Sequence, residues 1–399
     1  MKNTIYFLLY FLLVNTSYVI AFDLDSDLKL LNQQEKNNEL YFLDGKIELK
    51  TSFRGYEFNI KAAGRLNPFV EERNYSVFQD VYLKKELDRF SFSVGQKSFN
   101  KKIFEGPDQL DILNPIVIDS SLVNPIKLGI PFTQIEYSSE KHVLSLNYLP
   151  YFISNQLPSE KSPINLPGQL QEKIVTNDSL SSDRSIDQYY FELSSYWLLV
   201  DTRLSYLRHV SVATPQLEID NLQQVILNYL ELENISLSFV KTFESWLLKS
   251  FLTSKRFTNS KYDNLNHSIW GVGYEAPFYF SSSLETTIYA EYTRVITNKE
   301  VEPSLLNVNQ NDLFIGFRQP FDSLSNPELK VGVSVDTVLL DEHFFSVQYE
   351  QNFSPNTRFE VELVTINKGE SKSSINLNIN SLVPYAESDY LRLGLRIYL

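Results

Sequence analysis

The stretch DYLRLGLRIYL at Asp389–Leu399 decides the fold. Successive side chains of a β-strand point to opposite faces, so one face of this stretch carries only apolar residues: Leu391, Leu393, Leu395, Ile397 and Leu399. The other face carries Arg392, Gly394, Arg396 and Tyr398. This alternation is typical of the closing strand of a membrane β-barrel, which has lipid outside and water inside. A strand of a soluble sandwich can show the same pattern, so the prediction depends on its repetition.

The alternation recurs along most of the chain after residue 45. The clearest segments are 47–54, 56–61, 90–95, 144–148, 235–239, 329–336 and 358–363. Short links fall near 54–55, 87–88, 140–141, 199–201, 242–244 and 353–356, and slightly longer ones near 278–283 and 321–325. Much longer connections lie at 66–76, 99–130, 153–186, 213–230, 258–265, 296–309 and 367–387, and only the link near 338–341 breaks the alternation of short and long.

Short turns at one end and long loops at the other are typical of an outer-membrane barrel. The pattern gives about 17 recognisable strands, and a weak first strand within 22–44 makes the number even. The sequence therefore predicts an all-β fold, a transmembrane antiparallel β-barrel of about 18 strands with an inward-folded loop. A barrel of about 16 strands is the alternative.

The start of the sequence resembles an export signal. Residues 4–21 form an apolar run after Lys2, with small or aliphatic residues before Phe22, which predicts a secretory signal peptide over 1–21, cut after Ala21. The alternative is an uncleaved anchor, but the apolar core Ile5–Val14 is about half of the ~20 residues that a membrane helix needs. Residues 22–399 are then expected to form one barrel domain.

Composition excludes several classes of function. The chain has no cysteine, which excludes disulfides, thiolate metal sites and cysteine nucleophiles. Its formal net charge is −13, whereas nucleic-acid binding calls for basic patches. Aromatic residues make up 14% of the chain, with 28 Phe and 24 Tyr, which suits aromatic girdles at the two membrane interfaces.

Residues 77–153 resemble a family of bacterial outer-membrane barrels known only as a domain of unknown function. The matching positions are Asp111, Asn114, Pro115, Pro131, Pro150 and Phe152, and Trp246–Lys249 and the last strand also fit. The chain departs from the family pattern at Gln96-Lys97, at Phe251 and at its terminal Leu399. The resemblance implies a porin-like barrel of unassigned substrate, of a kind sometimes linked with export or uptake of lipidic or aromatic compounds.

The connection 99–130 is a candidate constriction. It exceeds the ~12–15 residues beyond which loops are usually functional or disordered. It is also too apolar for a solvated tip, with Leu110, Ile112, Leu113, Ile116, Val117 and Ile118. We predict that it folds inward as a constriction or partial plug, with candidate residues Asp108, Asp111, Asn114 and Pro115. Alternatively, it caps the barrel mouth or packs on neighbouring loops.

Charged residues on the inward face of the strands are the candidate lumen residues. By parity they include Lys97, Arg203, Lys249, Arg318, Arg358, Arg392, Arg396, Glu192, Glu291 and Glu360. Opposed charges around a barrel wall set the field in a pore and hence its ion selectivity. The alternative is mutual neutralisation by cross-strand pairs.

No motif for catalysis, a metal or a cofactor is evident. The four histidines lie far apart in the sequence, with no Gly-x-Ser-x-Gly or His-Glu-x-x-His motif, although a barrel enzyme of phospholipase or protease type stays open. The sequence favours a non-enzymatic outer-membrane channel for passive passage of small solutes. The expected partners are outer-membrane lipid, barrel-assembly machinery that recognises the C-terminal strand, and an unidentified solute. The rival is a plugged barrel that acts as a receptor or as a scaffold of an export or adhesion system.

Overall fold

The computed structural model describes most of the chain after residue 20. The described ranges are 21–35, 39–68, 71–106, 109–117, 121, 123–156, 174–176, 185–197, 199–212, 216–219, 225–281, 284–297, 306, 310–321, 325–338, 340, 342–368 and 389–398. The predicted signal peptide lies outside these residues, apart from Ala21.

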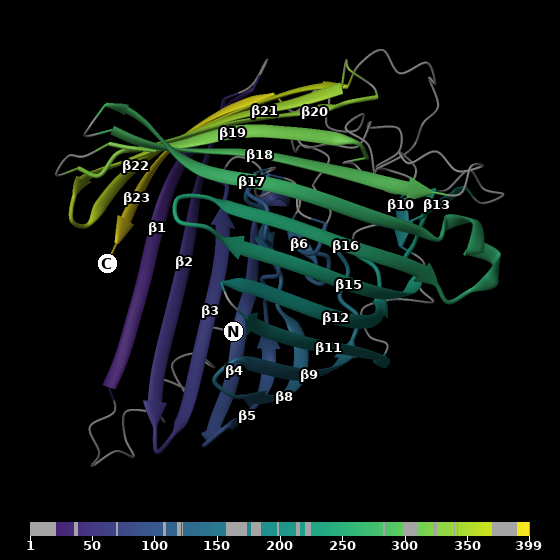
Figure 1. The fold of residues 1–399 in the computed structure, drawn as a ribbon. Helices are drawn as coiled ribbons and strands as arrows, with labels where there is room; N and C mark the ends of the chain where they lie inside the picture. Colours follow the sequence, from purple (N-terminus) through teal and green to yellow (C-terminus); the bar gives the residue numbers. More distant parts are fainter. Residues whose placement is uncertain are drawn as a thin grey trace.

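Eighteen strands form one antiparallel sheet (Figure 1). They are β1 (Ala21–Glu35), β2 (Glu39–Phe53), β3 (Tyr56–Leu66), β4 (Tyr75–Leu87), β5 (Phe90–Lys97), β8 (Ile130–Ser138), β9 (His142–Tyr151), β11 (Ser185–Trp197), β12 (Val200–Val210), β15 (Glu231–Thr242), β16 (Leu247–Phe257), β17 (His267–Ser281), β18 (Leu284–Thr297), β19 (Asp312–Pro320), β20 (Glu328–Asp336), β21 (Glu342–Ser354), β22 (Thr357–Lys368) and β23 (Tyr390–Tyr398).

Each strand pairs with the next in the chain, and β23 pairs with both β22 and β1, so the circuit of strands is closed. The predicted antiparallel barrel of about 18 strands is confirmed, including a first strand before residue 44. The 16-strand alternative is wrong.

Successive connections alternate between the two ends of the barrel, and the longest ones all lie at the same end. The hairpin at Arg54-Gly55 has both residues at positive φ, 50° and 76°, as expected for a two-residue turn that matches the twist of its strands. Asp88 and Leu199 also take positive φ in their turns, 53° and 67°. The link at 337–341, which breaks the length pattern in the sequence, joins β20 to β21 at the end of the long connections. It is therefore a short member of that set.

The outer wall is apolar and the inner wall is polar. In β5, Phe90, Phe92 and Val94 are 48%, 42% and 53% exposed, whereas the intervening Ser91 and Ser93 are buried. The same alternation exposes large apolar side chains on most other strands, including Ile47, Leu83, Ile135, Leu146, Leu204, Ile235, Leu252, Val272, Ile315 and Leu393. So large an apolar surface on the outside of a closed barrel is the surface that lipid covers.

Smaller elements occupy the connections. A two-stranded sheet joins β6 (Ile116–Val117) to β7 (Ile126–Lys127), and a three-stranded sheet contains β10 (Ile174–Thr176), β13 (Gln216–Ile219) and β14 (Val225–Asn228). Two 3-10 turns, η1 (Glu71–Arg73) and η3 (Ser260–Leu265), lie at the end of the long connections. Among the described residues there is no helix of the length and apolarity that crossing a membrane requires.

Candidate functional site

The connection between β5 and β8, residues 98–129, is the candidate site and is called the inward segment below. Its first residue is held by β4, because the backbone N–H and hydroxyl of Ser98 both donate to Asp80 Oδ1, at 2.7 and 2.9 Å. Its last residue returns to the same strand, where Gly129 N donates to the Phe78 carbonyl at 3.1 Å. Gln96 Nε2 donates to the carbonyls of both Phe78 and Gly129 at 3.0 Å. The two ends of the segment are therefore fixed side by side on the wall.

Asn114 and Pro115 hold the shape of the inward segment. Asn114 Oδ1 accepts the Phe99 backbone N–H at 2.8 Å, and its amide nitrogen donates to the Phe99 carbonyl. The Pro115 carbonyl accepts the Leu128 N–H at 2.7 Å. Both residues are buried. Their contacts brace the segment internally, which is one way to keep a long loop in one shape.

Asp111 forms an ion pair with Lys127, so it also cross-braces the two halves of the inward segment. Both side chains are largely shielded, with exposures of 13% for Asp111 and 24% for Lys127. Asp108, the remaining candidate from the sequence, lies outside the described residues.

The first anchor of the segment on the wall is apolar. Phe99 packs edge-on against Phe132 of β8 and Tyr190 of β11, with ring centroids 5.8 and 6.2 Å apart. Ile112 and Leu113 belong to the same buried cluster, together with Ile130, Leu149 and Leu207. The segment is thus packed against the β8–β12 side of the barrel.

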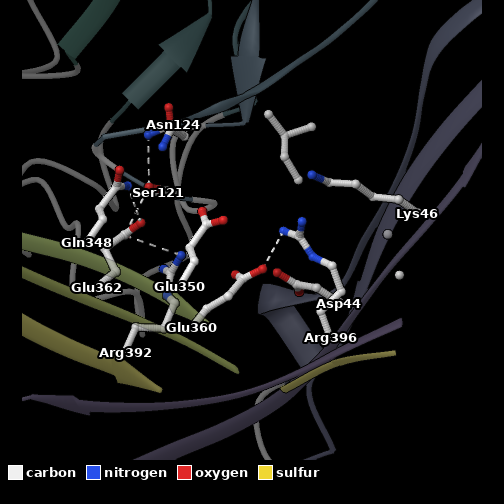
Figure 2. Close-up of a pocket in the computed structure, with 13 residues that line it drawn as sticks. Asp44, Lys46, Ser121, Asn124, Gln348, Glu350, Glu360, Glu362, Arg392 and Arg396 are labelled. Atoms are coloured by element: carbon white, nitrogen blue, oxygen red, sulfur yellow. Dashed lines mark hydrogen bonds and ion pairs between the residues drawn. The ribbon is translucent and has the colours of Figure 1, made fainter. Parts of the chain in front are cut away.

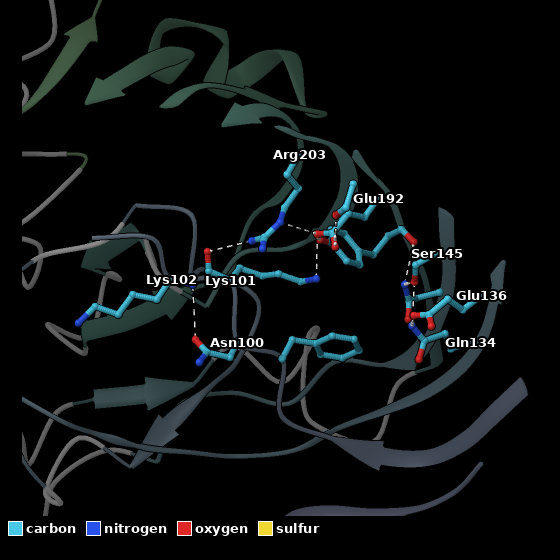
Figure 3. A network of polar contacts seen from close by, with 12 residues as sticks. Asn100, Lys101, Lys102, Gln134, Glu136, Ser145, Glu192 and Arg203 are labelled. Atoms are coloured by element: carbon cyan, nitrogen blue, oxygen red, sulfur yellow. Dashed lines mark hydrogen bonds and ion pairs between the residues drawn. The ribbon is translucent and has the colours of Figure 1, made fainter. Parts of the chain in front are cut away.

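Beside this anchor lies a charged network, shown in Figure 3. Lys101 Nζ pairs with Glu192 of β11 at 2.8 Å, and Arg203 of β12 donates to the Lys101 carbonyl at 3.3 Å. Arg203 Nε also lies 3.7 Å from Glu192. Burial lowers the pKa of Lys101, and the attraction of Glu192 opposes that shift. Two of the predicted lumen charges, Arg203 and Glu192, therefore contact the inward segment directly.

A second anchor is centred on Phe104, which is 1% exposed and packs against Phe251, Ile269 and Val295 of β16, β17 and β18. Next to it, Glu291 of β18 accepts two backbone N–H groups of the segment. They come from Glu105 at 2.7 Å and Gly106 at 2.8 Å. A carboxylate that accepts two amides gives charge-assisted hydrogen bonds, which are stronger than neutral ones.

Two further anchors lie on other sides of the barrel. Val117 is buried against Ala63, Tyr75 and Val77 of β3 and β4. Ser121 Oγ donates to Glu362 of β22 at 3.1 Å, and Val123 packs on the cluster of Val364, Ile366 and Tyr390. With the anchors on β8–β12 and β16–β18, the segment contacts four sides of the ring and spans the lumen.

The inward segment is thus folded into the barrel, as the sequence predicts. It also contacts a neighbouring connection, because Asn155 Oδ1 accepts the Ile116 N–H at 2.9 Å and Val117 forms a β-bridge with Gln156. The alternative of packing on another loop is therefore also partly realised.

A cavity of about 130 Å³ lies between the segment and the wall from β21 to β3 (Figure 2). Its lining carries charges of both signs. The charged residues are Asp44, Lys46, Glu350, Glu360, Glu362, Arg392 and Arg396, and the neutral polar ones are Ser121, Asn124 and Gln348. Arg396 pairs with Glu360 at 2.9 Å and Arg392 with Glu362 at 3.7 Å. The cavity is therefore suited to water and polar solutes.

A much smaller cavity, of about 20 Å³, lies on the opposite side of the segment. One side of it is apolar, formed by Leu110, Ile112 and Leu113 of the segment. The rest of the lining is mostly polar, with Lys101 on the segment and, on the wall, Arg203, Ser205, Asn234, Ser236 and Ser238 beside Tyr190 and Leu207. The two cavities on either side of the inward segment therefore differ in chemistry.

The other predicted lumen charges lie on the wall, and two of them form ion pairs. Lys249 pairs with Glu275 at 2.6 Å and Arg358 with Glu350 at 2.9 Å. Lys97 lies over the rings of Tyr82, Phe99 and Phe132, 5.6–6.0 Å from their centroids. Arg318 lies on β19 opposite Thr287 and Lys330. Some of these charges are thus neutralised by a partner on the neighbouring strand. The effect of the lumen charges on ion selectivity stays a prediction.

Sequence reasoning missed several inward residues. Phe104, Phe251 and Phe314 are buried on the inner side, although the expected rule is polar residues inside. Strand parity alone places Phe251 on the face of Lys249. Lys255 and His267 are also buried. Within the described residues, no group of three or more His, Asp or Glu is arranged to hold a metal ion.

Comparison with known proteins places the chain by fold alone. No model of a known protein family and no curated protein sequence matches it, so the resemblance to a family of unknown function stays a prediction. Among solved structures, it is similar to Pseudomonas aeruginosa OccD3 (OpdP), with a TM-score of 0.54 and 9% identity over 95% of this chain and 91% of that one. A mutant of the Rhodobacter blastica porin gives a TM-score of 0.43 and 9% identity over 95% of this chain and 100% of the porin. The likeness to OccD3 shows a shared barrel fold.

Proposed function

We propose that this protein is an outer-membrane channel that lets small polar solutes pass down their gradient without chemistry or energy input. The observation that carries the proposal is the charged cavity between the inward segment and the wall from β21 to β3. A barrel with an apolar outer surface and a charged inner cleft has the two surfaces that a diffusion channel needs.

The selectivity would come from this cleft. Lys46, Arg392 and Arg396 provide positive charges, and Asp44, Glu350, Glu360 and Glu362 negative ones. Because charges of both signs line the passage, the proposal favours polar or zwitterionic solutes over apolar ones. Outer-membrane lipid, the assembly machinery that reads the C-terminal strand, and a small solute are the proposed partners.

A plugged barrel that binds or scaffolds is the second candidate, and one observation favours it. The inward segment is anchored on four sides, and Phe104, Ile112, Leu113 and Val117 in it are each at most 6% exposed. A segment packed this tightly could close the lumen until a ligand or partner moves it.

Single-channel conductance in a planar bilayer tests the proposal. The full chain is expressed in a Gram-negative host, purified from outer membranes, and compared with a deletion of 103–122. A deletion of 260–265, the exposed η3 turn, is the control, because it shortens a connection at the same end without touching the anchors of the segment.

Stable open steps that enlarge only after deletion of 103–122 would support a channel constricted by the segment. Silence in the intact protein, with channels after the deletion, would make the protein a plugged or gated barrel. Silence in all three folded proteins would reject the channel and leave the binding role.

A further inference from the structure

Three basic side chains gather on the inner wall near the end of the long connections. They are His209 of β12, Lys255 of β16 and His267 of β17, with exposures of 2%, 2% and 4%. Lys255 is the cross-strand neighbour of His267 on one side and of Asn234 on the other. His209 belongs to the next strand beyond Asn234, where its neighbour is Leu232.

These side chains face the lumen. On β12, His209 lies an even number of residues from Arg203 and Leu207, so the three side chains are on the same face of the strand. Arg203 contacts the inward segment, and Leu207 belongs to the buried cluster that contains Phe99 of the segment. On β16, Lys255 is on the same face as Phe251, which packs on Phe104 of the segment. The bilayer is therefore separated from the three basic groups by the barrel wall, so a lipid headgroup is not the group that reaches them.

Some polar atoms of this cluster lack partners in the described part of the chain. Nε2 of His209 and Nε2 of His267 are both buried without a hydrogen bond. The hydrogen bonds and ion pairs found among the described residues include none to Lys255 Nζ, although its side chain is almost fully buried. A buried ammonium without a counter-charge is costly, and a bound anion would remove that cost.

We propose that Lys255, His209 and His267 form a binding site for a small soluble oxyanion, a phosphate or carboxylate group, on the inner wall. Lys255 supplies the ammonium that pairs with the anion. His267 Nδ1 lies 2.8 Å from the Leu265 carbonyl and donates there. Nε2 is therefore the acceptor of the neutral ring, and it becomes a second donor toward the anion when the ring takes up a proton together with the anion.

The neighbouring wall gives such an anion a route. Asn234, next to Lys255 across the β15–β16 ladder, also lines the small cleft. From there Ser236 and Ser238 present hydroxyls along β15, and the cleft ends at Lys101 and Arg203. Hydroxyl donors followed by the positive side chains of Lys101 and Arg203 suit an oxyanion better than a positively charged solute. The site goes beyond the proposed channel, because binding at this wall does not require that the pore conducts.

Isothermal titration calorimetry tests the site directly. Inorganic phosphate, and separately acetate, is titrated into the full-length barrel in octyl glucoside micelles, which carry no phosphate of their own. We expect saturable binding of at least one anion, and the stronger of the two identifies the preferred group. Lys255→Met should weaken that binding roughly tenfold or more, since a charge-assisted hydrogen bond is lost. The control Lys261→Met removes the same charge from the exposed η3 turn and should bind as the original chain does.

The folded state of each variant is checked by its heat-dependent migration on a gel. No saturable heat with either anion would overturn the proposal, and so would equal affinity in the original chain and Lys255→Met. If Lys255→Met does not fold, the double variant His209→Gln/His267→Gln decides. Weaker binding supports the site, and unchanged binding overturns it. Because the measurement is of binding, its failure is distinct from a failure of the channel.

Discussion

Truncation of Phe104 to alanine should release one anchor of the inward segment without unfolding the barrel. The Phe104 ring is 1% exposed and lies 5.1 Å, centroid to centroid, from that of Phe251. Ile269 and Val295 complete its pocket. None of the strand ladders involves Phe104, so the change acts on the docking of the segment and leaves the wall intact.

The expected size follows from the burial. Replacing a fully buried Phe by Ala typically costs about 3–5 kcal/mol. Each ~1.4 kcal/mol is a factor of ten in an equilibrium constant, so the undocked fraction at this anchor should rise roughly a hundredfold to a few thousandfold. The two hydrogen bonds from Glu105 and Gly106 to Glu291 remain, which keeps the segment docked most of the time.

Limited trypsin digestion of the folded barrel measures this fraction at the bonds after Lys101 and Lys102. When opening is fast relative to cleavage, the rate follows the population of the open form, so cleavage should accelerate by about two orders of magnitude or more. Phe92→Ala, which removes the same ring from the lipid-facing side of β5, should leave the rate unchanged. An unchanged rate in Phe104→Ala would refute the view that this ring holds the segment in the lumen.

Three further outcomes follow from single contacts. Arg65→Met should lower the urea midpoint of unfolding, because Arg65 donates to both oxygens of Asp44 at 2.7 and 3.0 Å, and breaking a buried pair costs about 3–5 kcal/mol. Gly95→Ala should prevent accumulation of folded protein in the membrane, since Gly95 has φ +142° and a Cβ there would lie 2.2 Å from the Val81 carbonyl. Arg392→Gln should shift the reversal potential in a KCl gradient toward that of K⁺, because the carboxylates of β22 lose an opposing charge. A shift toward Cl⁻ would contradict the placement of Arg392 in the passage.

The barrel could be predicted from the sequence because each strand carries its own local signal. Alternation with a period of two assigns every side chain to lipid or lumen, and the tight turns fix where each strand reverses. The last strand illustrates this, since Arg392 is buried while Leu393 and Ile397 are exposed. The strand number followed from counting turns, and the weakest strand, β1, was placed only by the need for an even number.

The arrangement inside the barrel was only partly predictable. The apolar run of 110–118 indicated that the segment turns inward, because such residues are costly in water. Nothing local could show that Lys101 meets Glu192 or that Ser121 meets Glu362, since these pairs join residues 91 and 241 positions apart. Asp111, Asn114 and Pro115 were chosen as constriction residues, and their contacts show them bracing the segment.

The wall and the segment form a single packed unit at the Phe104 anchor. A Cβ on Gly271 would lie 2.4 Å from the Phe251 ring and 2.8 Å from the Phe104 ring, and one on Gly273 would lie 3.2 Å from Phe104. The two glycines on β17 therefore make the hollow that the aromatic ring fills. Because close-packed contacts of this kind leave little room for gradual movement, we expect the segment to leave this anchor in one step rather than by gradual displacement. Any opening of the lumen here then depends on the whole anchor, whereas the passage proposed above follows the charged cleft on the other side of the segment and does not require this anchor to open.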